Sequence, residues 1–328
     1  MSAAPGDDID QLVASAADGD RRALARLLSL VERGGAGARA VGRATFARSG
    51  DAYTVGLTGA PGAGKSTLTS AVVAAARERD ERIAVLAIDP SSPYTGGAIL
   101  GDRVRMGDHA LDASVFIRSM ATRGHLGGLA LATPAAIRVL DAAGYPWVLV
   151  ETVGVGQVEV DIAGAADTTV VVVNPGWGDA VQANKAGLME IADVFVVNKA
   201  DRAGAEQTVH DIESMLDLTR RGDWRPPVVR TVSTSGSGAD DLWDAIAAHR
   251  RHLETGGGLE ERRAARRDEE LARIVDQRLR AAAEALVDEA ERTRRRDEVV
   301  RGTLDPWAAA DALLAPIESL LRDGPPAS

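Results

Sequence analysis

Seven short apolar runs, separated by segments with helical spacing, constrain the fold of this chain more than any other feature. Most are near-continuous runs of Val, Ile and Leu rather than alternations of polar and apolar residues. Such runs are typical of strands that are buried on both faces of a parallel sheet. The chain therefore predicts an α/β fold with a mostly parallel central sheet flanked by helices. The runs lie at residues 53–59, 82–89, 114–120, 146–152, 168–175, 193–199 and 227–233.

Helical patterns lie on both sides of this region. Residues 8–32 carry apolar side chains at helical spacing and predict one or two amphipathic helices. After a Gly-rich break, residues 259–296 predict one long charged helix with a narrow apolar stripe. A last helix is expected over 305–321, with Asp305 as its N-cap. We therefore expect an N-terminal helical segment (1–50), an α/β domain (51–255) and a C-terminal helical arm (256–328).

Composition excludes several classes of protein. Acidic residues outnumber basic ones by 48 to 38, for a formal charge of −10, whereas a nucleic-acid binder carries a basic patch. The chain has no cysteine, which excludes disulfides, thiol catalysis and thiolate metal sites. Its first residues lack the pattern of a signal peptide, and no apolar run reaches the ~18 residues of a membrane span. We expect a cytoplasmic protein that binds neither nucleic acid nor membrane.

The stretch "GAPGAGKST" matches the phosphate-binding pattern G-x-x-x-x-G-K-[ST], directly after a strand and at the start of a helix. Its glycines allow backbone N–H groups to converge on phosphate oxygens, and the helix N-terminus adds a favourable dipole. Lys65 is expected to contact the β- and γ-phosphates, and the Ser66 hydroxyl to bind Mg²⁺. The predicted phosphate-binding residues are Gly59, Ala60, Pro61, Gly62, Ala63, Gly64, Lys65, Ser66 and Thr67.

The segment "NKAD" ends a later apolar run and indicates guanine as the base. The carboxyl end of a parallel strand lies at the edge of the sheet where ligands bind. Asp201 can accept hydrogen bonds from N1–H and the N2 amino group of guanine, two donors that adenine lacks. Asn198 would brace the loop, and the aliphatic part of Lys199 would lie over the base. A site built for one hydrogen-bonding pattern rejects its analogue strongly.

Two more strand ends carry acidic residues that suit magnesium and the attacking water. Glu151 ends the fourth run and could hold Mg²⁺ or orient the water, and Gly154 could contact the γ-phosphate through its N–H. Asp89 and Asp102 lie in the segment after the second run and are candidate Mg²⁺ ligands. We therefore expect Mg²⁺ to be bound by Ser66, Asp89, Asp102 and Glu151. The catalytic candidates are Lys65, Glu151, Asp102 and Gln157, and the last three remain alternatives for placing the water.

Two further features stay open. The segment Asn174–Gly187 is either a third nucleotide-responsive loop, through Asp179, Gln182 and Lys185, or a turn capped by Asp179. The five histidines are scattered along the sequence. His249 and His252 share a helix face, but no third metal ligand lies nearby, so we expect both to be solvated.

Taken together, these motifs resemble the MeaB/ArgK family, the methylmalonyl-CoA mutase-associated GTPases of the SIMIBI class. The resemblance covers about residues 8–321 and includes "AIDPSSPYTGGAILGDRVRM", "FIRSMATRGHLGGLA", "ETVGVGQVEV" and "GWGDAVQANKAGLMEIADVFVVNKAD". It implies a P-loop GTPase that binds GTP or GDP with Mg²⁺ and hydrolyses GTP. It also implies a homodimer joined through the C-terminal helical arm.

The same resemblance implies a client protein. Family members gate the loading of adenosylcobalamin into an acyl-CoA mutase and protect that mutase from inactivation. The cofactor belongs to the mutase, with methylmalonyl-CoA mutase favoured and isobutyryl-CoA-type mutases possible. One departure concerns the loop after the last strand, where relatives show Ser-Ala and this chain has Val232-Ser233. Ser233, Thr234 and Ser235 are expected to contact the base there.

Two other functions use the same phosphate loop. A GTP-driven metal-insertion chaperone would need clustered Cys and His ligands, which the sequence does not provide. A small-molecule kinase would need an acceptor pocket and has little use for a guanine-specific Asp201. The family also carries an old label as an ATP-dependent amino-acid transport component. That label conflicts with "NKAD", because this segment indicates guanine rather than adenine as the base.

Overall fold

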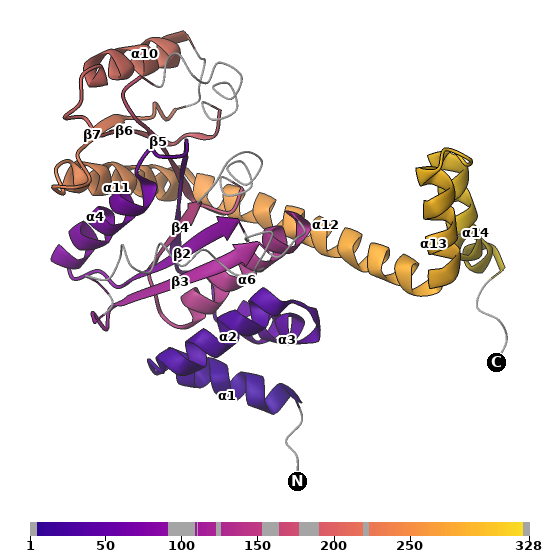
Figure 1. Cartoon of the computed structure of the whole chain (residues 1–328). Helices are drawn as coiled ribbons and strands as arrows, with labels where there is room; N and C mark the ends of the chain where they lie inside the picture. The colour runs from indigo at the N-terminus through magenta and orange to yellow at the C-terminus, as the bar shows by residue number, and fades with distance from the viewer. Residues whose placement is uncertain are drawn as a thin grey trace. The chain divides into compact units, whose positions relative to one another are not determined.

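The structure is a computed structural model of the 328-residue chain, and it describes residues 5–90, 109, 111–122, 126–152, 164–176, 190–218 and 223–323. By contacts, the chain separates into a unit of residues 1–266 and a unit of residues 267–328. Within the described residues, seven parallel strands form one sheet with the order β3-β2-β4-β1-β5-β6-β7 (Figure 1). The strands are β1 (Tyr53–Gly59), β2 (Ile83–Pro90), β3 (Val115–Thr122), β4 (Trp147–Thr152), β5 (Thr168–Val173), β6 (Val194–Asn198) and β7 (Val228–Thr231).

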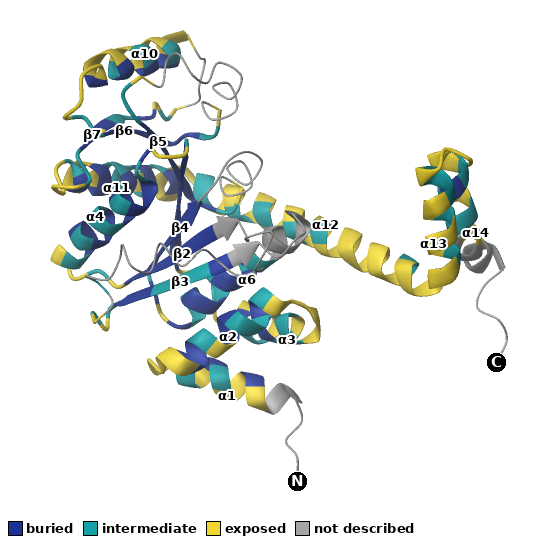
Figure 2. Cartoon of the chain, in the orientation of Figure 1, coloured by how far each residue is buried: buried dark blue, intermediate teal, exposed yellow. Residues whose placement is uncertain are grey.

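These strands confirm the α/β fold and all seven predicted runs, with small shifts at their ends. The runs are mostly apolar because helices cover both faces, and all residues of β1, β4, β5 and β6 are buried (Figure 2). The first unit contains α1 (Pro5–Ala17), α2 (Arg21–Arg33), α3 (Gly35–Phe46), α4 (Lys65–Glu78), α6 (Leu126–Ala142), α10 (Ala205–Leu218), α11 (Ala239–Gly256) and the first turns of α12 (Gly258–Leu286).

Three layers result from this arrangement. On one face of the sheet, α4 and α11 pack on alternate residues of the strands, including Leu57, Leu149 and Val196. On the other face, α6 and the N-terminal helices cover β2, β3 and β4, while α10 covers β5 and β6. The core therefore lies on both sides of the sheet, and the loops at the strand ends remain available for a site.

The N-terminal layer contains one helix more than the sequence predicts. Helices α1 and α2 account for the expected amphipathic pattern, with Leu24, Leu27, Leu28 and Val31 buried. Helix α3 was not predicted because its sequence, "GAGARAVGRATF", is rich in glycine, which disfavours helix formation. It is held by packing on α2 and α6 rather than by its own propensity.

Helix α2 also covers the outer strand of the sheet. Arg21 donates hydrogen bonds to the carbonyl oxygens of Asp112 (3.1 Å) and Val115 (2.8 Å). Ser114 O accepts from Ile83 N of β2, so Val115 O points from the outer edge of β3. Arg118 of β3 in turn pairs with Glu32 of α2 at 2.8 Å.

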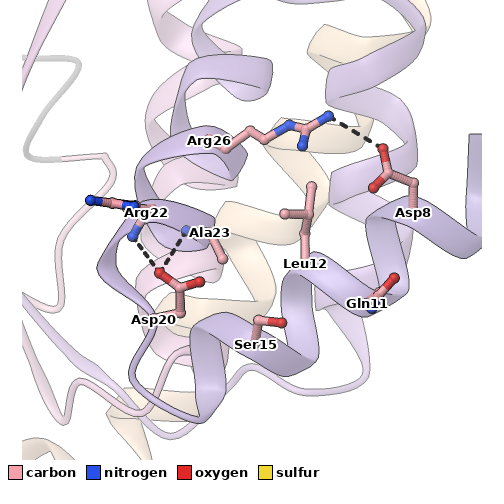
Figure 3. A pocket seen from close by; sticks show the side chains of 8 residues that line it. All are labelled: Asp8, Gln11, Leu12, Ser15, Asp20, Arg22, Ala23 and Arg26. Carbon is pink, nitrogen blue, oxygen red and sulfur yellow. Dashed lines mark hydrogen bonds and ion pairs between the residues drawn. The ribbon is translucent and has the colours of Figure 1, made fainter.

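A pocket of about 300 Å³ lies between α1 and α2 (Figure 3). Its lining includes the exposed Arg26–Asp8 ion pair (3.3 Å) and Asp20, which caps α2 by accepting from Arg22 N and Ala23 N. None of its lining residues belongs to the predicted phosphate or base loops.

The second unit corrects one prediction. The expected single helix over 259–296 ends at Leu286, and a new helix, α13 (Glu289–Val300), begins after it. The break occurs because Asp288 is an N-cap: its carboxylate accepts hydrogen bonds from Ala290 N (2.8 Å) and Glu291 N (3.1 Å). Helix α14 (Pro306–Asp323) starts as predicted, with Asp305 capping Trp307 N and Ala308 N, and it packs on α13.

The histidine expectation is wrong for His249. Its side chain is completely buried rather than solvated, and Nδ1 lies 2.8 Å from Thr168 Oγ1. His252, one turn later, is only partly buried. No helix that the structure describes is long and apolar enough to cross a membrane.

Candidate functional site

The phosphate loop joins the carboxyl end of β1 to the start of α4. Helix α4 begins at Lys65, so the backbone of the loop leads directly into the helix N-terminus, a position whose N–H groups and dipole suit an anion. Lys65 is buried, and its Nζ donates hydrogen bonds to Gly59 O (2.5 Å) and Ala60 O (3.2 Å). The ammonium group therefore lies against the loop itself, at the place where phosphates bind in such loops.

Two positions of this loop require glycine for two reasons: neighbouring atoms leave no space for a side chain, and the backbone has a positive φ angle. Gly59 (φ 138°) lies so near β5 that a Cβ atom would be 2.0 Å from Val172 O. Gly64 (φ 90°) has no room either, because a Cβ atom would be 2.5 Å from Asn198 Nδ2. Glycine is the residue that adopts these backbone angles without strain. The loop is thus fitted against β5 on one side and β6 on the other.

Ser66 and Glu151 form a hydrogen-bonded hydroxyl–carboxylate pair in the site. Glu151 is fully buried in β4, opposite Leu57 of β1, and its Oε1 accepts a hydrogen bond from Ser66 Oγ at 2.5 Å. A hydroxyl and a carboxylate are hard oxygen donors of the kind that Mg²⁺ prefers. Because both lie beside the phosphate loop, this pair fits a magnesium ion that also contacts phosphate oxygens and water.

Asn198, the last residue of β6, connects three loops. Its Nδ2 donates to Ala63 O of the phosphate loop at 2.8 Å. Its Oδ1 accepts from Thr231 Oγ1 (3.0 Å), Ser233 N (3.2 Å) and Ser233 Oγ (2.6 Å). The carboxamide is therefore satisfied on both sides, and it ties the phosphate loop to the loop after β7.

The neighbours of Asn198 complete the base side of the site. Lys199 adopts a left-handed backbone angle (φ 58°), and its Nζ donates to Gly62 O at 2.6 Å. Asp201 is exposed, as a carboxylate that contacts a bound base must be. The loop after β7 closes through a Val232–Ser237 bridge, which leaves Thr234 and Ser235 exposed at its tip.

These loops meet at one edge of the sheet, and the chain that carries them matches a known protein family. A family model described as "Methylmalonyl Co-A mutase-associated GTPase MeaB" matches residues 24–288 of the chain. The chain belongs to this family. The resemblance drawn from its motifs is confirmed, and the protein is a P-loop GTPase of the MeaB family.

Individual relatives agree with this assignment. A Pyrococcus abyssi protein named as a GTPase is 51% identical over 313 residues, covering 94% of this chain and 97% of the relative. The mouse mitochondrial methylmalonic aciduria type A homolog is 34% identical over 273 residues, covering 81% of this chain and 66% of the relative. The match to the crystal structure of a LAO/AO transport system kinase covers 97% of this chain and 100% of the kinase chain, with 27% sequence identity and a TM-score of 0.70.

The structure brings together many of the residues predicted from sequence. The phosphate loop, Glu151, Asn198, Lys199 and Ser233 lie in mutual contact through the bonds given above. Asp89 lies at the carboxyl end of β2, one residue beyond the Ile88–Thr152 pair, and its side chain is outside the described residues. Also outside them are Asp102, Gly154, Gln157, Asp179, Gln182 and Lys185.

Sequence reasoning missed Thr231 of this MeaB-family site. It is buried, and its hydroxyl donates to Asn198. One signal was available, because Thr231 is a polar residue at the carboxyl end of an apolar strand, as are Glu151 and Asn198. Among the residues that the structure describes, no three His, Asp or Glu side chains gather closely enough to hold a metal ion by themselves.

Proposed function

We propose that this GTPase is a Mg²⁺-dependent chaperone for an adenosylcobalamin-dependent acyl-CoA mutase, with methylmalonyl-CoA mutase as the favoured client. Bound GTP would set its affinity for the mutase while the cofactor is loaded, and hydrolysis would end that state. The client is supported by the family description and by the name of the mouse relative. The observation that carries the nucleotide part is the Asn198–Ala63 hydrogen bond, which joins the base loop to the phosphate loop.

The phosphate side would work through charge and backbone dipoles. Lys65 places a buried ammonium group at the loop, and the N–H groups at the start of α4 face the same space. Ser66 and Glu151 would hold magnesium, with Asp89 and Asp102 as further candidates. The ion, when bound, neutralises the charge that develops on the phosphates. Glu151, Asp102 and Gln157 are the candidates for placing the attacking water.

The base side would select guanine. Asp201 accepts from the two donors on guanine, while Lys199 and the loop of Ser233, Thr234 and Ser235 enclose the ring. Asn198 fixes both loops in place through its four hydrogen bonds. An adenine would leave the Asp201 carboxylate desolvated without donors, which is costly.

The C-terminal arm would join two copies of the chain. Helix α12 is 29 residues long and has no buried residue, and it exposes an apolar stripe of Leu271, Val275, Leu279 and Leu286. Amphipathic helices in water owe most of their stability to packing of the apolar face. A second copy would supply that packing, and the homodimer that the family resemblance implies would follow.

The test is nucleotide-dependent binding to a purified mutase. The full chain, preloaded with GTP, with GDP or with no nucleotide, is passed over immobilised methylmalonyl-CoA mutase, with an isobutyryl-CoA-type mutase in parallel. We expect binding to one mutase to differ between GTP and GDP, and the bound mutase to lose activity more slowly during turnover. The chaperone role would be contradicted by a chain that binds neither mutase, or by binding that is the same in all nucleotide states.

A matched variant separates base recognition from folding. Asp201→Asn should lose GTP-dependent mutase binding and regain it with xanthosine triphosphate, whose base presents an acceptor where guanine has the N2 donor. Unchanged GTP affinity in this variant would remove Asp201 from the base-binding role. Regain with the xanthine nucleotide would show that the variant is folded and that the nucleotide controls the complex.

A further inference from the structure

A cluster of charged side chains lies at the amino ends of β5 and β6, the edge of the sheet opposite the nucleotide loops. Asp167 immediately precedes β5 and is 1% exposed. Its Oδ2 accepts from Thr54 N of β1 (2.9 Å) and from Arg263 (3.1 Å), and its Oδ1 accepts from Arg266. Burial alone would raise the pKa of Asp167, but Arg266 and Arg263 hold it below its ordinary value.

Asp193 occupies the equivalent place before β6. Its carboxylate accepts from Thr169 N (2.9 Å) and, through both oxygens, from Arg262 (2.8 and 2.9 Å). His249 Nε2 lies 3.3 Å from Oδ1, and the side chain of Asp193 is 9% exposed. A two-pronged arginine–carboxylate pair of this kind is among the stronger ionic contacts in proteins.

All three arginines come from the first turns of α12. They reach the amino ends of three strands, because Arg262 also donates to Asp167 O and Arg263 to Gly50 O and Ala52 O before β1. As one short helical stretch supplies every cation, the three arginines engage or leave the two carboxylates together. We name Asp167, Asp193, Arg262, Arg263 and Arg266 the amino-edge clamp.

The same strands carry the nucleotide loops at their other ends. β1 ends at Gly59, and Val172 of β5 leaves no space for a side chain there. β6 ends at Asn198, about 17 Å from Asp193 for five residues of extended strand. A small displacement of β5 or β6 would therefore alter the two contacts that fit the phosphate loop in place.

We propose that docking of residues 258–266 through the amino-edge clamp is coupled to nucleotide retention at the carboxyl ends of β5 and β6. If the helix leaves, two buried carboxylates lose the cations that offset their desolvation, which is costly, and water then competes for the hydrogen bonds they accept from Thr54 N and Thr169 N. The amino ends of the strands then become less firmly held. As a result, the contacts of Gly59 with β5 and of Asn198 with the phosphate loop also weaken. Coupling between two sites is reciprocal, so bound nucleotide must also hold the clamp closed. The inference rests on the proposed guanine-nucleotide site but not on the mutase.

The first test measures release of a fluorescent GDP analogue from the full chain, at a temperature where circular dichroism shows every variant folded. Arg262→Gln is the mildest break, since its side chain is 41% exposed. We expect release to be about 3–10-fold faster than in the parent chain, and Arg262→Lys, which keeps the charge but not the two-pronged contact, to restore part of the difference. The matched control is Arg225→Gln, which removes an exposed pair with Asp217 (2.5 Å) and should leave release unchanged.

An unchanged release rate in folded Arg262→Gln would overturn the proposal and leave the clamp a purely structural feature. Failure of the parent chain to bind the GDP analogue would instead strike the nucleotide site, so the two failures are distinguishable.

A second test uses the unmodified chain and does not depend on any variant folding. Amide hydrogen exchange is compared with and without GDP at Thr54 and Thr169, whose N–H groups bond the clamp carboxylates, and at Ile83, whose N–H bonds Ser114 O outside it. We expect GDP to slow Thr54 and Thr169 about fivefold more than Ile83. Equal slowing at all three amides would indicate global stabilisation alone and would overturn the proposal.

Discussion

At the carboxyl ends of β1, β5 and β6, the contacts that bind the loops together are hydrogen bonds of amides, hydroxyls and backbone carbonyls, with Lys65 and Lys199 donating to carbonyls. At the amino ends of the same strands, the contacts are ion pairs between buried carboxylates and arginines. The printed contacts of the first edge run to neutral acceptors, the carbonyl oxygens and the Asn198 carboxamide, so we call it the neutral edge. The second edge is held by ion pairs between buried or partly buried groups, so we call it the ionic edge.

The largest expected effect comes from breaking the ionic edge. Asp167→Ala removes the partner of Arg263 and Arg266 and the acceptor of Thr54 N. We expect the free energy of unfolding, measured by urea denaturation at pH 7, to fall by about 3–5 kcal/mol. The exposed Arg225→Gln control should change it by less than about 0.5 kcal/mol. Similar small losses in both variants would show that the ionic edge is no more important than the surface.

Acid should weaken the ionic edge through His249. Burial lowers the pKa of His249 to about 4, with Asp193 opposing the shift, whereas an unfolded histidine titrates near 6.5. The folded state thus binds fewer protons, so this stability is complete above pH 6.5 and is lost as pH falls towards 4. The loss should approach about 3 kcal/mol at full protonation. The lowered pKa of Asp167 adds a further loss in the same direction below about pH 3.8.

The test of this pH dependence is a variant that removes the titrating group. Unfolding free energies between pH 4 and 7 should have a shallower slope in His249→Gln than in the parent chain. An unchanged slope would place the titrating group elsewhere in the molecule.

A third change tests the neutral edge. Gly64→Ala puts a Cβ atom 2.5 Å from Asn198 Nδ2 at φ 90°, whereas Gly62→Ala (φ 74°) meets nothing within 4 Å. Both variants bear the strain of a left-handed backbone, about 1 kcal/mol, but only Gly64→Ala must displace Asn198. We expect Gly64→Ala to lose about 2 kcal/mol of unfolding free energy. Its GDP affinity, by calorimetry, should fall well below that of Gly62→Ala.

The smallest effect is expected at Thr231. Thr231→Val removes one of three donors to Asn198 Oδ1 while Ser233 still supplies the other two. The unfolding free energy should fall by about 1 kcal/mol, with a modest loss of GDP affinity in the same calorimetric assay. A loss as large as that of Asp167→Ala would mean that the neutral edge is as strongly held as the ionic one.

The sequence predicted which loops meet at the neutral edge, but it predicted no part of the ionic edge. Continuous apolar runs identify buried strands, and "GAPGAGKST" and "NKAD" are local patterns whose positions at strand ends follow from a parallel sheet. The clamp joins Arg262 to Asp193 across 69 residues. No local spacing distinguishes these three arginines from Arg267, the fourth arginine of "RRAARR". His249 was missed for a related reason, since only the assembled sheet shows what lies against its helix.

The other differences between the predicted and the observed helices have separate causes. The break between α12 and α13 depends on the side chain of Asp288, a residue that would also be unremarkable within a charged helix. Helix α3 depends on packing against α2 and α6, which overrides its glycine-rich sequence. Thr231 could have been found by asking which polar residue ends each predicted strand.

The two arginine contacts on the outer edge of β3 have a consequence for assembly. An uncovered edge strand offers a row of carbonyl and N–H groups with which a strand of another molecule can pair, and this is a common start of aggregation. Arg21 occupies the Val115 carbonyl, and α2 lies over the strand through the Arg118–Glu32 pair. The opposite edge strand, β7, is only four residues long and carries the exposed Arg230. Arg21 therefore blocks one edge carbonyl of β3, and short length and charge limit pairing at β7.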